Sequence, residues 1–184
     1  MNLSSREFWG IVHGMGLGAL YLLAFAGAFA GLWSLRSRLL TNEGVNERMP
    51  RLKAGLAIMA VVAWLTVITG TWIVYPWYRA GATDVCERTA VADVPEECGA
   101  KWDLLADSNT AEWHDFAMEW KEHVAWIVPL FATAVAAAVI YLGRDLLTRG
   151  DVRRQLIWFL VASFGLAAIA GLFGALITKN APVV

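Results

Sequence analysis

The chain contains four long stretches in which apolar residues follow one another with no acidic or basic side chain between them. Each stretch reaches the roughly 20 residues that an α-helix needs to cross about 30 Å of hydrocarbon. We therefore predict four transmembrane helices, packed as an all-α integral membrane four-helix bundle in one domain, residues 1–184. The predicted spans are 8–35, 54–78, 124–143 and 155–178.

The connections between the spans are polar, and the middle one is the longest. We expect residues 79–111 to form an outer loop, with the third helix extending outward from about residue 112. A loop of this length is uncommon as a bare connector, so we expect it to cover part of the bundle or to bind a partner. Lys101 to Ser108 is predicted to form a short amphipathic turn. Within the first connection, the segment Thr41 to Pro50 is expected to be turn-like because it contains Asn and Gly residues.

Composition supports the membrane interpretation. Hydrophobic residues make up 58% of the 184 residues and charged residues 17%, and there are ten tryptophans, which exceeds the apolar share of a typical soluble domain. The first span is too long for the apolar region of a signal peptide, and Arg6 is offset by Glu7, so we expect this span to be retained. The net charge of −1 gives no reason to expect nucleic acid as a partner.

Charges are distributed unevenly among the connections. The middle loop holds three basic residues against seven acidic ones, whereas the first and third connections are rich in arginine. By the positive-inside rule, the first and third connections face the cytoplasm, and the middle loop and both termini lie on the outer side of the cytoplasmic membrane. The basic residues of the first connection are Arg36, Arg38, Arg48, Arg51 and Lys53, and those of the third are Arg144, Arg149, Arg153 and Arg154.

Both cysteines, Cys86 and Cys98, fall in the outer loop. An oxidising compartment would let them pair, and closing so small a ring would stabilise the fold by roughly 3 kcal/mol. A redox-active pair is the alternative, but the spacing is far from Cys-x-x-Cys. We therefore expect a structural disulfide.

The three histidines are the main candidates for a functional site. Along an ideal helix, His13 lies about 34 Å from Arg36 at the inner interface. His123 lies about 32 Å from Arg144, and His114 about 45 Å from the same residue. His13 and His123 are thus predicted to lie at one depth. His114 and His123 are separated by about 180° around one helix, so only one of them can face a given centre.

Two features of the neighbouring sequence suit a haem site. A glycine stripe at four-residue intervals from Gly10, which includes Gly14, borders His13 and would let a flat ring approach the backbone. Glu119 lies one helical turn before His123 and is placed to contact it. Two level imidazoles on different helices resemble the arrangement in four-helix membrane cytochromes of the b type. The resemblance rests on these residues and on the helix count, and it includes no long motif.

This resemblance implies a membrane-embedded electron-transfer protein or subunit that binds one haem b near the outer face, with His13 and His123 as axial ligands. The implied partners are the lipid bilayer, a redox protein or larger membrane complex at the outer face, and a membrane carrier such as a quinol. A stand-alone enzyme is disfavoured, because the sequence contains no Ser/His/Asp order, zinc signature or phosphate-binding loop.

Two other interpretations remain open. Asp115, Glu119 and His123 follow one another at four-residue intervals and could bind copper, zinc or iron together with His13. His114 could form a weak soft-metal site with the methionine four residues further on. Alternatively, the chain is a cofactor-free accessory subunit whose glycine stripe and acidic outer loop dock it into a larger membrane complex.

Overall fold

The computed structural model of the protein describes residues 3–36 and 40–181. Within these residues the chain is all-helical and contains no strand. Four helices are long and apolar enough to cross a membrane, which confirms the predicted fold class at this level. They are Ser5–Ser34, Asn42–Tyr78, Trp113–Leu147 and Gly150–Asn180.

Each of the first three spans is divided into shorter helical segments. The first span consists of α1 (Ser5–Ile11), a π-helical turn η1 (Val12–Gly16) and α2 (Leu17–Ser34). The second consists of α3 (Asn42–Thr69), a π-helical turn η2 (Gly70–Val74) and α4 (Tyr75–Tyr78). The third consists of a π-helical turn η4 (Trp113–Met118), α7 (Glu119–Val124), α8 (Ile127–Leu142) and a 3-10 turn η5 (Gly143–Leu147). The fourth is the single helix α9 (Gly150–Asn180).

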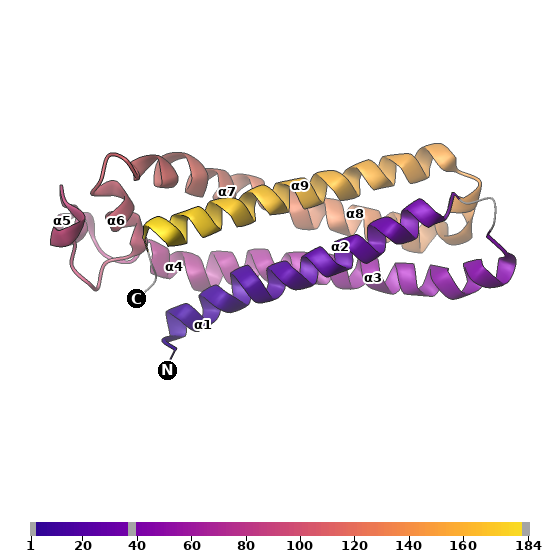
Figure 1. Cartoon of the computed structure of the whole chain (residues 1–184), viewed down its shortest axis with the longest axis horizontal. Helices are drawn as coiled ribbons and strands as arrows, with labels where there is room; N and C mark the ends of the chain where they lie inside the picture. The colour runs from indigo at the N-terminus through magenta and orange to yellow at the C-terminus, as the bar shows by residue number, and fades with distance from the viewer. Residues whose placement is uncertain (1–2, 37–39, 182–184) are drawn as a thin grey trace.

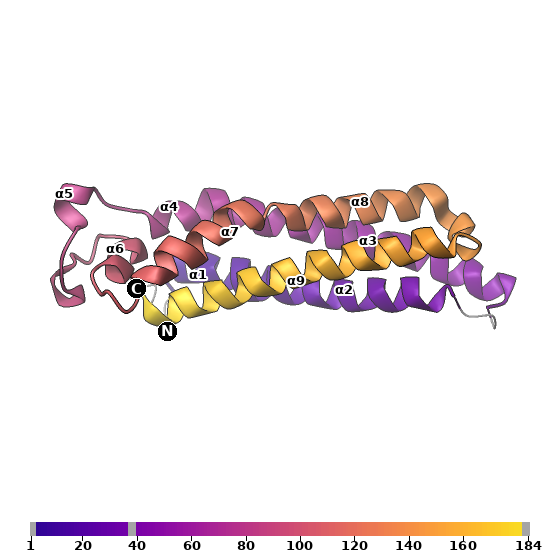
Figure 2. The ribbon, with the colours of Figure 1, turned by 90° about the horizontal axis from the view of Figure 1, so that it is seen from above.

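The spans run alternately in opposite directions, so that sequential spans are neighbours (Figures 1 and 2). Helix α2 contacts α3 and α9, and α8 contacts the same two helices from the opposite corner of the bundle. Helix α1 begins and α9 ends at the end of the bundle where residues 79–111 lie (Figure 1). We call residues 79–111 the lid, this end the lid end, and the opposite end the basic end.

The core runs along the bundle axis. Its side chains are excluded from solvent and come from all four spans, so the spans form one packed unit. Gly31 of α2 permits close packing, because a Cβ there would lie 2.8 Å from the Cδ1 atom of Leu52 in α3. The largest fully buried core side chains include Leu32, Leu56, Met59, Val135, Val139 and Leu160.

Large apolar side chains also cover the outside of the bundle. Leu23 is 71% exposed, Trp158 is 67% exposed and Tyr141 is 89% exposed. An apolar surface of this extent is costly in water but suits a lipid bilayer. The exposed face therefore agrees with the length and composition of the spans.

One local prediction was wrong. The segment Thr41 to Pro50 is not turn-like, because α3 begins at Asn42 and runs through Pro50. The Thr41 side chain caps the helix by accepting a hydrogen bond from the Gly44 backbone N–H at 3.1 Å. Val45 and the residues one turn further on are buried at helical spacing. Capping and burial therefore outweigh the turn preference of the Asn and Gly residues.

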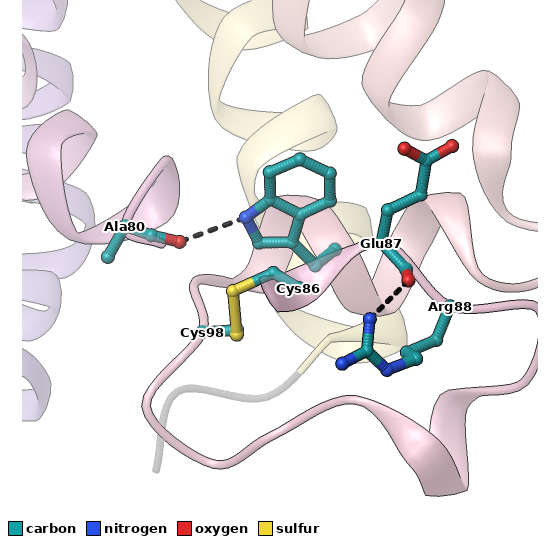
Figure 3. Close-up of a disulfide and its surroundings, with 6 residues drawn as sticks. Ala80, Cys86, Glu87, Arg88 and Cys98 are labelled. Carbon is teal, nitrogen blue, oxygen red and sulfur yellow. Dashed lines mark hydrogen bonds between the residues drawn. A yellow bond between two sulfur atoms is a disulfide. The ribbon is translucent and has the colours of Figure 1, made fainter. Parts of the chain in front are cut away.

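The lid is closed by the predicted disulfide between Cys86 and Cys98 (Figure 3). Both cysteines are buried beside Trp102. Gly81 has a φ of +96°, and a Cβ there would clash with the Cys86 sulfur, so the turn into the ring requires glycine. The lid's helical segments are α5 (Thr83–Cys86), a 3-10 turn η3 (Val91–Asp93) and α6 (Ala100–Leu105), and α6 confirms the predicted amphipathic turn.

The lid folds back on its own first residues and packs against the end of the second span. The Gly99 backbone N–H donates to the Ala80 carbonyl at 2.8 Å. The indole N–H of Trp102 donates to the same carbonyl at 3.0 Å (Figure 3). A Cβ on Gly99 would overlap the carbonyl oxygens of Trp77 and Tyr78. The lid therefore rests on the bundle rather than extending away from it.

Candidate functional site

Polar and ionisable side chains lie between the helices in the half of the bundle nearest the lid. Three spans carry a π-helical turn in this half, at η1, η2 and η4. A π-turn inserts an extra residue into a helix and is frequently found at functional sites. We call the polar side chains of this region the polar interior. They are His13, Thr69, Tyr75, Tyr78, His114, Lys121 and Glu122.

His13, in η1, faces the second span. Its Nδ1 atom lies 3.2 Å from the Oγ1 atom of Thr69. The single hydroxyl proton of Thr69 is directed to the carbonyls of its own helix, at 2.8 Å from Leu65 and 3.1 Å from Thr66. Thr69 can therefore only accept from the imidazole, which places the ring proton on Nδ1. In the neutral ring Nε2 is left with a free lone pair.

Gly70 makes room for this imidazole. A Cβ on Gly70 would lie 2.7 Å from Cε1 of His13, and 3.3 Å and 3.4 Å from its Nε2 and Nδ1 atoms. Any larger residue would therefore push the ring away from Thr69. Because Gly70 also begins the π-turn η2, the backbone irregularity and the ring contact occur at the same place.

Lys121 brings a basic group from the third span into the same region. Its amine lies 2.8 Å from the position that a Cβ on Gly174 would occupy, so it crosses to α9. His13 of the first span lies in the same region. An ionisable residue inside a membrane span is costly and usually functional.

Glu122 of the third span directs its carboxylate toward the end of the second span. Its Oε1 atom is buried and has no hydrogen-bond partner among the residues that the structure describes. The carboxylate lies beside the Tyr75 hydroxyl of the second span. A buried oxygen that accepts no hydrogen bond costs free energy, so the Glu122 Oε1 atom is an acceptor available to a donor group.

His114 is the most buried of the histidines, with 8% of its surface exposed. Its Nδ1 atom lies 2.8 Å from the Tyr78 hydroxyl, and the two rings are 5.9 Å apart. Leu104 of the lid and Ile177 of α9 pack around this pair. His114 and Tyr78 thus join the second and third spans beneath the lid.

His123 lies at the surface instead. Its side chain is 75% exposed, and its Nδ1 atom lies 2.8 Å from the Glu119 backbone carbonyl and 4.0 Å from the Glu119 carboxylate. The predicted contact with Glu119 is therefore present. Asp115 is exposed on the same helix. In residues 3–36 and 40–181 no group of three or more His, Cys, Asp or Glu side chains is arranged to hold a metal ion.

The glycine stripe beside His13 is also open. A Cβ on Gly10 or Gly14 would meet no atom within 4 Å. His13 itself turns toward Thr69 and Gly70. In the part of the chain that the structure describes, no contact joins the His13 ring to the His123 ring. The structure joins His13 to the second span, His114 to Tyr78, and His123 to its own helix.

Two charged groups at the lid end have altered proton affinities. The hydrogen bond from Arg79 to the Tyr75 hydroxyl, 2.8 Å long, raises the pKa of Arg79 above its ordinary value. Partial burial in α6 raises the pKa of the Asp103 carboxyl. Neither residue belongs to the polar interior, but Arg79 places a permanent positive charge at its rim.

Sequence analysis alone did not identify Lys121, Glu122, Tyr78 or Thr69. The helical spacing of His114, Met118 and Lys121 puts these three residues on one face of the third span, and this was the available signal. The pairing of that face with Thr69 and Tyr78 depends on how the spans are rotated within the bundle.

The fold and the polar interior define a class: an all-helical protein with four spans suited to a membrane, a disulfide-closed lid, and an ionisable cluster at the lid end. No protein-family model matches the chain, and neither the comparison with curated proteins nor that with solved structures finds a match. Function must therefore be inferred from the site itself.

Proposed function

We propose that the chain is a membrane-embedded electron-transfer protein or subunit that binds one b-type haem at the lid end through His13. One observation supports this most directly. The His13 imidazole donates from Nδ1 to Thr69 and keeps the Nε2 lone pair free, as metal-ligating histidines do. A haem held there would supply one-electron chemistry. The chain's own contribution is to fix the tautomer of the ring and to hold the ring against Gly70.

His123 remains the proposed second axial ligand. The exposed position of its ring means that binding would require the side chain to leave the Glu119 carbonyl and turn. His13 thus presents a free Nε2 lone pair as its ring stands, whereas His123 could bind iron only after this rearrangement. The metal-site alternative based on Asp115, Glu119 and His123 lacks such support, because these side chains are exposed.

The remaining parts of this proposal concern orientation and partners. We place the lid and both termini on the outer side of the cytoplasmic membrane, because the basic end carries most of the arginines. A disulfide in the lid suits an oxidising outer compartment. Electrons would pass between a membrane carrier such as a quinol and a redox protein or larger complex docked at the lid end.

A second candidate function is a cofactor-free accessory subunit of a larger membrane complex. The open glycine stripe favours it. Gly10, Gly14 and Gly18 all face open space, and small residues on a lipid-facing helix surface commonly mark a place where another helix packs.

A visible spectrum distinguishes the two candidates. The full-length protein would be produced with haem supplied and purified in mild detergent, and its spectrum recorded before and after dithionite. We expect a Soret band and a reduced α band, with about one haem per chain. His13→Ala should abolish both bands, and His123→Ala should abolish or shift them.

The matched control is His114→Ala, which removes an imidazole that already has a partner in Tyr78. It should keep the haem. Full haem content in His13→Ala would refute the role of His13. A colourless, metal-free preparation that co-purifies with other membrane subunits would refute haem binding and support the accessory-subunit function.

A further inference from the structure

A groove lies at the basic end of the bundle, opposite the lid. It has a volume of about 330 Å³ and is open to the surface. One wall is the first part of α3 and the other is the turn η5, which ends the third span. The residues that line the groove are Asn46, Met49, Pro50, Lys53 and Arg144. Two of the five are basic, and none is acidic.

The position of the Arg144 guanidinium is fixed by neutral groups. It donates to the side-chain oxygens of Asn46 at 2.9 Å and Asn42 at 3.1 Å. These two asparagines are four residues apart and lie on one face of α3, so they bind two nitrogens of the same planar group. The guanidinium is oriented, but its charge is not neutralised.

Lys53 carries the second positive charge. Its amine donates to the Ile140 carbonyl at 3.0 Å, which again is a neutral acceptor. Gly143, with a φ of +50°, ends α8 at this point, and a Cβ there would lie 3.3 Å from the Lys53 amine. The helix end therefore leaves room for the amine to reach the groove.

No nearby acid neutralises these two charges in the part of the chain that the structure describes. Asp145, the neighbour of Arg144, lies 3.7 Å from Arg149 instead. Glu43 and Glu47 are exposed on α3, and within residues 3–36 and 40–181 neither forms an ion pair with Lys53 or Arg144. The groove thus presents two fixed positive charges without a bound anion from the chain itself.

The groove lies at the level where a membrane changes from hydrocarbon to headgroups. Lys53 directly precedes the apolar run of the second span, and Arg144 directly follows that of the third. Basic residues at this depth meet lipid phosphates. Met49 and Pro50 add an apolar wall, which suits a ligand with both a phosphate and an acyl chain.

We infer that this groove binds the phosphate headgroup of an anionic phospholipid, held between the Arg144 guanidinium and the Lys53 amine. The site is independent of the proposed haem, which concerns the opposite end of the bundle. Its ligand is a lipid of the surrounding bilayer, because the groove opens at headgroup level.

The test uses full-length protein that has been delipidated in mild detergent. Binding of phosphatidylglycerol is measured by native mass spectrometry, with phosphatidylcholine and inorganic phosphate as the comparison ligands. Removing one basic residue near a membrane surface weakens anionic-lipid binding by about 5-fold. We therefore expect Lys53→Gln and Arg144→Gln each to lower phosphatidylglycerol affinity about 5-fold, and the double variant to lower it about 30-fold.

Arg51→Gln with Arg154→Gln provides the matched control. Both arginines are exposed at the same end but do not line the groove. This control should change the affinity by less than about 3-fold. An equal loss in the control pair would show that only the general charge of this end matters, and would overturn the site. Equal binding of phosphatidylcholine, or of inorganic phosphate, would overturn the assignment to an anionic lipid.

Misfolding of the glutamine variants is checked by circular dichroism. Should the double variant fail to fold, Arg144→Lys provides the second measurement, because lysine keeps the charge and still binds phosphate. It should retain most of the affinity, while Lys53→Gln alone should lose about 5-fold. A larger loss of affinity in Arg144→Lys than in Lys53→Gln would contradict the proposed role of charge in this groove.

Discussion

A buried hydrogen-bond chain joins three of the four spans, and its energetics can be predicted in detail. Ser163 of α9 is completely buried, and its hydroxyl donates to the Val128 carbonyl of α8 at 3.0 Å. The Tyr21 hydroxyl of α2 lies 2.7 Å from the Ser163 hydroxyl oxygen. Because serine has one proton and gives it to Val128, Tyr21 must be the donor to Ser163.

The two single substitutions should therefore differ in cost. Ser163→Ala removes both bonds and leaves the buried Tyr21 hydroxyl without a partner, which costs about 1–3 kcal/mol. Tyr21→Phe removes one donor and leaves the bond from Ser163 to Val128 intact, so it should cost about 0.6 kcal/mol, the average for hydrogen bonds between membrane helices. In the double variant no hydroxyl remains unpaired. The free-energy cost of the double variant should therefore be about 1 kcal/mol less than the sum of the costs of the two single substitutions.

The assay is equilibrium unfolding of the purified protein in mixed micelles of mild detergent and dodecyl sulfate, followed by circular dichroism. Tyr141→Phe is the matched control, because its side chain is 89% exposed and the loss of its hydroxyl should cost nothing measurable. If the free-energy cost of the double variant equals the sum of the two single costs within about 0.3 kcal/mol, the hydrogen-bond chain is refuted. A Tyr21→Phe cost that exceeds that of Ser163→Ala would refute the assigned donor.

Two further predictions concern the polar interior and the lid. Gly70→Ala should displace His13 from Thr69 and destabilise the protein by about 1–3 kcal/mol in the same unfolding assay. Gly10→Ala is the control and should not destabilise the protein, because its new Cβ would meet nothing within 4 Å. Equal effects of the two substitutions would contradict the contact between Gly70 and His13. Burial raises the pKa of Asp103 above its ordinary value of 3.8, so its contribution to stability is fully present below pH 3.8 and is lost as the pH rises through the raised pKa. Asp103→Asn should therefore be more stable than the wild type at pH 7 but not at pH 3, as measured by the midpoint of thermal unfolding. A gain in stability of the same size at both pH values would argue against a raised pKa of Asp103.

The main features of the fold could be predicted from the sequence because they depend on local properties. Apolar runs long enough to cross a membrane give the spans, and two cysteines close in sequence within one loop give the disulfide. The start of α3 at Asn42 was missed because the sequence Thr41 to Pro50 contains residues that favour turns. Its helical state depends on a cap and on burial against other spans, which a single segment does not reveal.

The site could be predicted only in part. The sequence predicts that His114 and His123 cannot both face one centre, and the structure has one of them buried and the other exposed. The choice of which faces inward was made from depth along an ideal helix. The third span is not ideal, because it contains the π-turn η4 and a break between α7 and α8. Each irregularity rotates the residues beyond it, so rotation cannot be obtained by counting from Arg144.

The second span connects the lid to the polar interior. Its last residue, Tyr78, has its carbonyl against Gly99 of the lid and its hydroxyl against His114 of the third span. The carbonyl contact leaves no space for a side chain at Gly99, so the lid cannot shift without moving the end of this span. A displacement of the lid at Gly99 would thus be passed to His114 through one tyrosine.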